Sequence, residues 1–179
     1  MHHFNWSPGI GDPTIGGWVT VGLYFAAALS CWASARRTYT AERHIWMVIS
    51  LLFVALGINK QLDLQSALTE LGRLIAFHGG WYERRQSVQL GFVVVVAMIC
   101  VGAIATLFAL ARRTPIATWV ALLGTAIVLG FVLIRAASFH HVDRFIGGSV
   151  LGFRWNWILE MGGITIVLLA SMSRRRAII

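Results

Sequence analysis

Charged residues are scarce in this sequence. Asp, Glu, Lys and Arg make up 12% of its 179 residues, whereas an ordinary soluble domain carries about 25%. Hydrophobic residues make up 58%, and the mean hydropathy is +0.73. A water-soluble globule of this size cannot hide that much apolar surface. The composition therefore excludes a soluble protein, and we expect residues 1–179 to form a single membrane domain.

Lysine and cysteine are also rare. Lys60 is the only lysine among fifteen basic residues, and there are two cysteines, Cys31 and Cys100. The net charge of +8 would suggest nucleic-acid binding in a soluble protein. Here the arginines stand at the ends of apolar segments, where they act as topology signals, so we expect no nucleic-acid partner. Both cysteines lie inside apolar runs and are interpreted as packing residues.

The sequence also lacks the common motifs of soluble enzymes. It contains no HExxH, no P-loop, no GxSxG, and no GxGxxG following a strand. These absences leave open whether the chain is an enzyme.

The apolar runs predict an all-α, polytopic membrane protein with five transmembrane helices. We expect the spans at 16–35, 44–63, 88–111, 116–139 and 155–172. Residues 1–15 contain no Lys or Arg, so they lack the basic region of a cleaved signal peptide and are expected to form an outer tail. Residues 174–179 are expected to form a cytoplasmic tail. Five spans would place the two termini on opposite sides of the membrane.

Clustered arginines indicate the orientation. Eight of the fifteen basic residues fall directly beside span ends on one side: Arg36, Arg37, Arg43, Arg112, Arg113, Arg174, Arg175 and Arg176. The other seven are spread over longer loops on the opposite side. By the positive-inside rule, the clustered side is cytoplasmic and the N-terminus is outside.

One loop has a helical pattern of its own. Leu64, Leu68, Leu71 and Ile75 recur at spacings of 4, 3 and 4 residues, with polar residues between them. We expect an amphipathic interfacial helix at 64–78 on the outer face. A helix packed on a partner protein would give the same pattern.

Polar residues are predicted to gather at the outer ends of the spans. The apolar run 45–58 is too short to cross a bilayer, so its helix must continue to Asp63. Glu160 lies fourteen residues before Arg174, which is ~21 Å along a helix. The sequence predicts no such polar groups in the inner half. The predicted cluster consists of Asn59, Lys60, Asp63, Gln89, Arg135, Asn156 and Glu160.

An ionisable group at membrane depth should face the bundle and find a partner. We expect Glu160 to pair with Lys60 in preference to Arg135, because the helical rise puts Lys60 closer to its level. Two interpretations follow. The pair fixes helix register, or the cluster lines a water-accessible binding cavity.

Histidines near the predicted outer face form a candidate metal site. His140 and Asp143 share a helical face, and His78 closes the predicted interfacial helix. Nitrogen and oxygen ligands of this kind suit a divalent metal such as zinc, manganese or iron. In that case Glu160 or Asp63 would be the general acid or base. A hydrogen-bonding role or a solvated loop remains an alternative for these histidines.

Three stretches resemble a family. The segments LGINKQLDLQ (56–65), GWYERR (80–85) and RAASFHHVD (135–143) are similar to segments of small bacterial multi-pass inner-membrane proteins. The resemblance extends from Pro8 to Glu160. It implies a bacterial inner (cytoplasmic) membrane and supplies no mechanism.

Two functions remain compatible with these patterns. The first is a non-catalytic membrane protein, a subunit of a larger complex or a small binding module, whose partners are membrane lipid and other membrane subunits. In-span glycines would allow close helix approach: Gly57, Gly91, Gly102, Gly124, Gly130, Gly162 and Gly163. The alternative is a membrane-embedded metal-dependent hydrolase acting on a lipid or periplasmic substrate.

Overall fold

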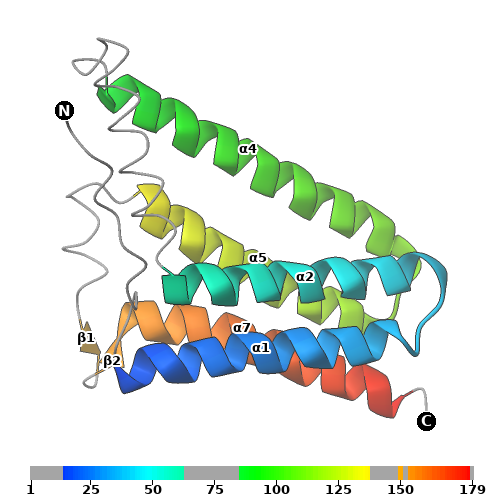
Figure 1. The fold of residues 1–179 in the computed structure, drawn as a ribbon. Helices are drawn as coiled ribbons and strands as arrows, with labels where there is room; N and C mark the ends of the chain where they lie inside the picture. Colours follow the sequence, from blue (N-terminus) through cyan, green and yellow to red (C-terminus); the bar gives the residue numbers. More distant parts are fainter. Residues whose placement is uncertain (1–13, 63–84, 138–148, 151–152, 178–179) are drawn as a thin grey trace.

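The structure is a computed structural model that describes residues 14–62, 85–137, 149–150 and 153–177. These residues form an all-helical bundle (Figure 1), as the sequence predicts. Its helices are α1 (Ile15–Ala35), α2 (Thr40–Leu62), α4 (Arg85–Leu110), α5 (Ile116–Ala137) and α7 (Trp155–Arg176). A short 3₁₀ turn, η2 (Ala111–Arg113), follows α4, and β1 (Ser149–Val150) pairs antiparallel with β2 (Phe153–Arg154).

Local sequence explains where these helices begin and end. The Thr14 hydroxyl caps α1 by accepting a hydrogen bond from the backbone N–H of Gly17 at 3.1 Å. Pro115 disfavours helical backbone at the residue before it, and Thr114 is accordingly extended. The chain therefore leaves η2 at Thr114 and starts α5 directly after the proline, a position that suits proline because no helical N–H is needed there.

The helices run along one another and share two ends. α1 packs against α2 and α7, α7 packs against α5, and α4 contacts mainly α5. α1, α4 and α7 begin at one end, where α2 and α5 finish (Figure 1). We call this the Glu160 end. The opposite end is the arginine end, since it holds all eight of the clustered arginines.

Two glycines bring α5 and α7 into close contact. A Cβ atom on Gly124 would lie 2.9 Å from the Gly163 carbonyl oxygen, and one on Gly163 would lie 2.7 Å from Cγ2 of Val128. Any side chain at either position would push the helices apart. Small residues of this kind let membrane helices pack backbone to backbone.

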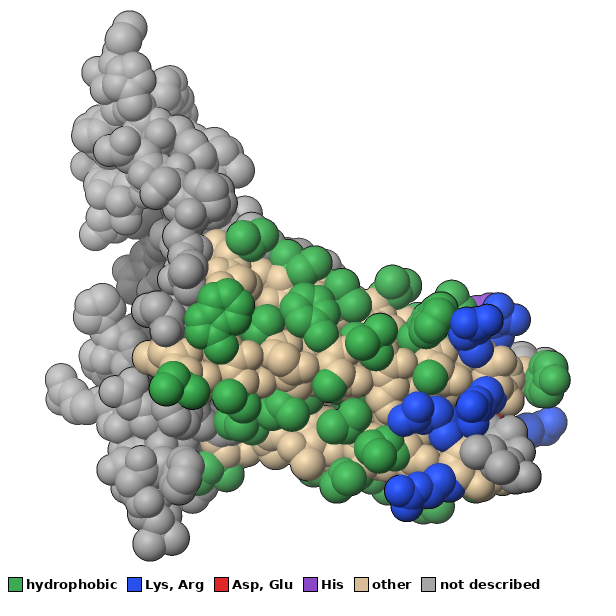
Figure 2. Space-filling view, turned by 60° about the horizontal axis from the view of Figure 1, so that its bottom comes forward, with side chains coloured by type: hydrophobic (Ala, Val, Ile, Leu, Met, Phe, Trp, Pro, Cys, Tyr) green, Lys and Arg blue, Asp and Glu red, His purple; other side chains and the backbone are tan. Residues whose placement is uncertain are grey.

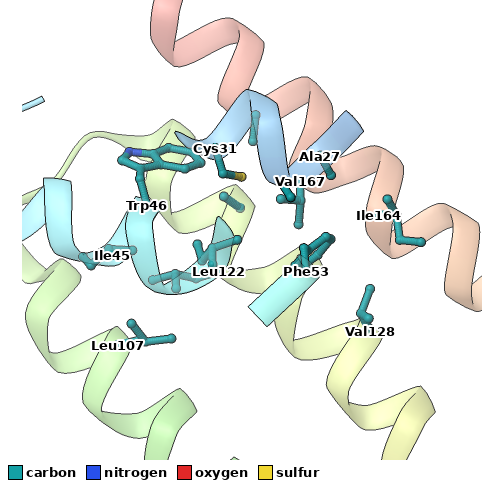
Figure 3. Close-up of a cluster of buried hydrophobic side chains, with 14 of the residues drawn as sticks. Ala27, Cys31, Ile45, Trp46, Phe53, Leu107, Leu122, Val128, Ile164 and Val167 are labelled. Atoms are coloured by element: carbon teal, nitrogen blue, oxygen red, sulfur yellow. The ribbon is translucent and has the colours of Figure 1, made fainter. Parts of the chain in front are cut away.

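The bundle buries a mixed core and exposes apolar side chains. Trp46, Phe53, Ile164 and Val167 are among the buried residues of one hydrophobic cluster (Figure 3), to which Tyr24 also belongs. Polar residues are also buried: Thr20, Ser30, Ser34, Thr38, Ser50, Thr118, Thr125, Glu160 and Ser171. The exposed large side chains are largely Leu, Val, Ile and Met. This distribution suits a molecule whose solvent is lipid, because contact with lipid favours apolar exteriors.

Within the described residues, three helices are long and apolar enough to cross a membrane: Ile15–Ala35, Glu42–Leu62 and Ile116–Ile134. Figure 2 shows hydrophobic side chains along one face of the bundle, with Lys and Arg side chains gathered at one end. These features identify a membrane-embedded protein. The predicted interfacial helix at 64–78 lies outside the described residues.

Candidate functional site

Three helices meet at a buried carboxylate near the Glu160 end. Glu160, on α7, is 3% exposed. Its Oε2 lies 3.0 Å from Nζ of Lys60 on α2, and its Oε1 accepts a hydrogen bond of 3.2 Å from the hydroxyl of Tyr24 on α1. We call these three residues the Glu160 cluster. It links α1, α2 and α7 through side chains alone.

Small and aromatic residues make room for this cluster. Gly57 lies one turn before Lys60 on α2, and a Cβ atom there would come within 3.2 Å of the Tyr24 Cβ. Phe53, one turn before Gly57, packs edge to face against the Tyr24 ring, with the ring centroids 5.7 Å apart. The spacing 53, 57, 60 keeps these residues on one face of α2. The absence of a side chain at Gly57 leaves space for Tyr24, and Phe53 packs against the Tyr24 ring.

The Glu160 cluster is electrically balanced and closed. Lys60 supplies the positive charge, and its side chain is 12% exposed against 4% for Glu160. Each carboxylate oxygen already accepts a hydrogen bond. Desolvation of two charges is costly, and good geometry with added hydrogen bonds offsets it. For Glu160 to act on a substrate proton, Lys60 or Tyr24 would first have to move.

A second carboxylate anchors the arginine end. Glu42 on α2 receives a two-pronged ion pair from Arg174 on α7, with Nε–Oε1 at 2.7 Å and NH2–Oε2 at 2.9 Å. Trp46 Nε1 and the Thr118 hydroxyl of α5 also donate to Oε1, at 3.2 and 2.9 Å. We call these four residues the Glu42 cluster.

A seam of hydroxyls joins α1 and α7 near the same end. The hydroxyls of Ser30 and Ser171 lie 2.6 Å apart, and the Ser34 hydroxyl donates to the Ser171 carbonyl oxygen at 3.0 Å. Arg175 NH2 donates to the Ser30 hydroxyl at 2.9 Å, while its buried Nε has no hydrogen-bond partner within the described part of the chain. Cys31 is buried beside this seam as a free thiol. The seam fixes the contact between α1 and α7.

The structure confirms the predicted pair between Glu160 and Lys60. Asn59 lies half-buried on α2, next to that pair in sequence. Gln89, Arg135 and Asn156 lie in α4, α5 and α7, but their side chains fall outside the described part. The remaining predicted site residues also lie outside it: Asp63, His78, His140 and Asp143.

The arginine end also holds polar contacts that the sequence analysis did not predict, namely the Glu42 cluster and the serine seam. Serine and threonine hardly interrupt an apolar run, so their burial leaves no trace in hydropathy. Helix α7 continues to Arg176, into the segment predicted as a cytoplasmic tail, and Arg174 and Arg175 bond to side chains on α2 and α1.

Tyr24 and Glu42 are among the site residues that the sequence analysis missed. Tyr24 stands in an apolar run where an aromatic residue is unremarkable. Glu42 comes three residues before the apolar run of α2 and resembles an ordinary acidic residue in a helix's first turn. The signal that could have found Glu42 is its position: it is a carboxylate at the start of α2, at the same end of the bundle as Arg174 near the end of α7.

No group of three or more His, Cys, Asp or Glu side chains within the described ranges is arranged to hold a metal ion. The predicted ligands His78, His140 and Asp143 lie outside these ranges. No model of a protein family, no curated protein and no solved structure matches this chain.

Proposed function

We propose that the chain is a non-catalytic integral membrane protein, a subunit of a larger membrane complex or a small binding module. It spans a bacterial inner membrane five times, with the N-terminus outside and the C-terminus in the cytoplasm. In this arrangement the arginine end faces the cytoplasm, and the Glu160 cluster lies towards the outer face.

One observation carries this proposal. The described residues include two acidic side chains, Glu42 and Glu160, and both are held in ion pairs with further hydrogen bonds. A general acid or base needs a carboxyl group within reach of the substrate proton. Here each carboxylate instead connects three helices. Because both carboxylates hold helices together, they favour a structural role for these charges over a catalytic one.

Helix geometry supports five spans. The five helices contain 21, 23, 26, 22 and 22 residues. At 1.5 Å per residue each is about 30 Å long or longer, enough for the hydrocarbon core. The arginines at one end satisfy the positive-inside rule if that end is cytoplasmic. We take α4 and α7 as the two further spans, alongside the three helices that are long and apolar enough to cross a membrane.

The exposed apolar surface is where a partner subunit would bind. α4 contacts the rest of the bundle mainly through α5, and its Val94, Met98 and Val101 are about half exposed or more, at 47%, 61% and 62%. Lipid covers such a surface equally well, so association must be measured. The protein should be extracted with its surrounding bilayer by a styrene–maleic acid copolymer. Native mass spectrometry then measures the mass of the protein assembly in the extracted particle.

The expected result is a particle that contains the 19.8 kDa chain together with other membrane chains in fixed ratio. A chain that migrates alone at its own mass contradicts the subunit proposal. Elemental analysis of the same sample tests the hydrolase alternative. A stoichiometric metal that a His140→Ala variant loses would contradict a non-catalytic role, while metal content at background level agrees with it.

A further inference from the structure

A hollow of about 470 Å³ opens at the arginine end. It lies between the connection from α1 to α2 and the connection from α4 to α5. The residues lining it include Tyr39, Glu42, Leu110, Arg112, Arg113 and Thr114. Its volume is within the range of small-molecule sites, about 300–1,000 Å³. Neither the Glu160 cluster nor the packing of the bundle uses it.

The two arginines give the hollow a positive charge. η2 places Arg112 and Arg113 at the mouth, immediately after α4 ends, and both side chains are exposed. Neither has a hydrogen-bond or ion-pair partner among the described residues. Their ten guanidinium donors therefore face a ligand or solvent. Guanidinium groups bind phosphate with two parallel hydrogen bonds, which makes them well suited to a phosphate ligand.

The acidic wall of the hollow does not cancel this charge. Glu42 lines it, but Arg174 already engages both of its carboxylate oxygens, and Trp46 and Thr118 donate to Oε1. An anion in the hollow therefore meets a carboxylate whose charge is balanced by Arg174.

An apolar surface continues from the hollow along α4. Ala109 lines the hollow and is exposed. Further along the same helix, towards the Glu160 end, exposed residues recur at spacings of 4, 4, 3 and 4, which places them on the same face: Ala105, Val101, Met98 and Val94. A ligand with an anionic head and hydrocarbon chains would contact both parts, whereas free phosphate would contact only the first.

We propose that this hollow binds the phosphate headgroup of an anionic phospholipid, with an acyl chain lying along the exposed side of α4. Basic pockets between transmembrane helices on the cytoplasmic side have the charge that such headgroups require. The inference rests on the membrane orientation proposed above but not on the absence of catalysis.

Binding should be measured by native mass spectrometry of the full chain in detergent, titrated with phosphatidylglycerol and, in parallel, with phosphatidylcholine. The test variant is Arg112→Gln with Arg113→Gln. The matched control is Arg36→Gln with Arg37→Gln, which removes two adjacent exposed arginines from the same end but outside the hollow. Thermal unfolding of each variant checks that the bundle is intact.

We expect the test variant to bind phosphatidylglycerol about 30-fold more weakly, as the loss of two surface cations implies, and the control to lose much less. Phosphatidylcholine should bind weakly to all three proteins. Equal losses in test and control variants would show general attraction to the positive end and overturn the site. Displacement of the lipid by inorganic phosphate at matched concentration would overturn the lipid as ligand, since it would identify a site for the free anion.

Discussion

At the scale of single residues, the contribution of the Glu160 cluster to stability depends on whether both of its charges are present. Lys60 and Tyr24 together satisfy both oxygens of a carboxylate that is 3% exposed. Removing one partner leaves the other charge buried without compensation, whereas removing both charges eliminates the desolvation cost as well as the attraction. The cluster can therefore be tested by comparing single with double substitutions.

The single variants Glu160→Gln and Lys60→Met should each lower the free energy of unfolding by about 3–5 kcal/mol. The double variant should recover most of that loss. Tyr24→Phe removes one hydrogen bond and should cost only about 1 kcal/mol. Thermal unfolding in detergent measures all four.

Three outcomes of this series separate the interpretations of the cluster. Single variants as stable as the parent would show that the pair contributes nothing to the fold. A double variant that recovers both stability and association with its partners would show that the charges only fix the register of the helices. One that recovers only stability would identify the cluster as a binding site, against the role proposed here.

The Glu42 cluster depends on the shape of the guanidinium group as well as on its charge. Arg174→Lys keeps the cation but cannot reproduce the two-pronged contact with Glu42. We expect it to lower the free energy of unfolding by about 1–2 kcal/mol. Arg176→Lys is the matched control, because Arg176 is exposed at the end of the same helix. Equal effects on thermal unfolding from both substitutions would contradict this role for Arg174.

Residue-scale prediction from the sequence succeeded where depth along a helix was enough. The helical rise places Lys60 and Glu160 at similar levels, and the cost of isolated charges in a membrane requires them to meet. It failed where rotation about the helix axis matters. Nothing in the sequence indicates that Tyr24 points at Glu160, or that Thr118 on α5 reaches Glu42 on α2.

At the scale of elements, the contact between α5 and α7 depends on two glycines. A methyl group at Gly163 would meet Val128 Cγ2 at 2.7 Å and the Gly124 carbonyl oxygen at 3.1 Å. Gly163→Ala should therefore lower the free energy of unfolding by about 1–3 kcal/mol through overpacking. Thermal unfolding in detergent measures the loss.

The neighbouring glycine provides the control for that change. A Cβ atom at Gly162 meets nothing within 4 Å in the described part of the chain. Gly162→Ala should raise stability by up to about 1 kcal/mol, because alanine favours a helix interior. If both alanine variants gained stability, the helices would not be in backbone contact at this crossing.

The sequence identified the glycines but not their roles. Gly57, Gly124 and Gly163 would meet neighbouring helices within 3.2 Å if they carried a Cβ atom, whereas Gly102, Gly130 and Gly162 have open space. All six stand in apolar segments and look alike in the sequence. Which of them lies at a crossing depends on which face each helix turns to its neighbour, and long apolar helices carry little amphipathic pattern to reveal that.

At the scale of the whole molecule, apolar runs and arginine clusters were sufficient to predict an all-helical membrane bundle. The helices overlap the five predicted apolar segments, and three of them are apolar enough to span a membrane. The order of packing, with α1 and α7 between α2 and α5, could not be derived from the sequence. It depends on side-chain contacts such as the serine seam, which hydropathy does not report.

Orientation provides a final prediction at this scale. Both native cysteines should first be replaced by serine, so that single new cysteines can report which side they face. Ile15→Cys lies at the start of α1, where the side chain is 85% exposed, and Ala177→Cys lies just after α7 at the arginine end. In intact bacterial spheroplasts, a membrane-impermeant maleimide should label Ile15→Cys, and it should label Ala177→Cys only after the membrane is opened.

The pattern of labelling tests two properties of the molecule separately. Labelling of Ala177→Cys alone in intact cells would invert the orientation and contradict the positive-inside reading of the arginine end. Labelling of both positions from one side would contradict five spans, because an odd number of crossings must separate the ends of the chain. Each helix reverses the direction of the one before it. A transmembrane arrangement of α1, α2, α4, α5 and α7 with the arginines inside therefore requires that intact spheroplasts label Ile15→Cys and that Ala177→Cys is labelled only after the membrane is opened.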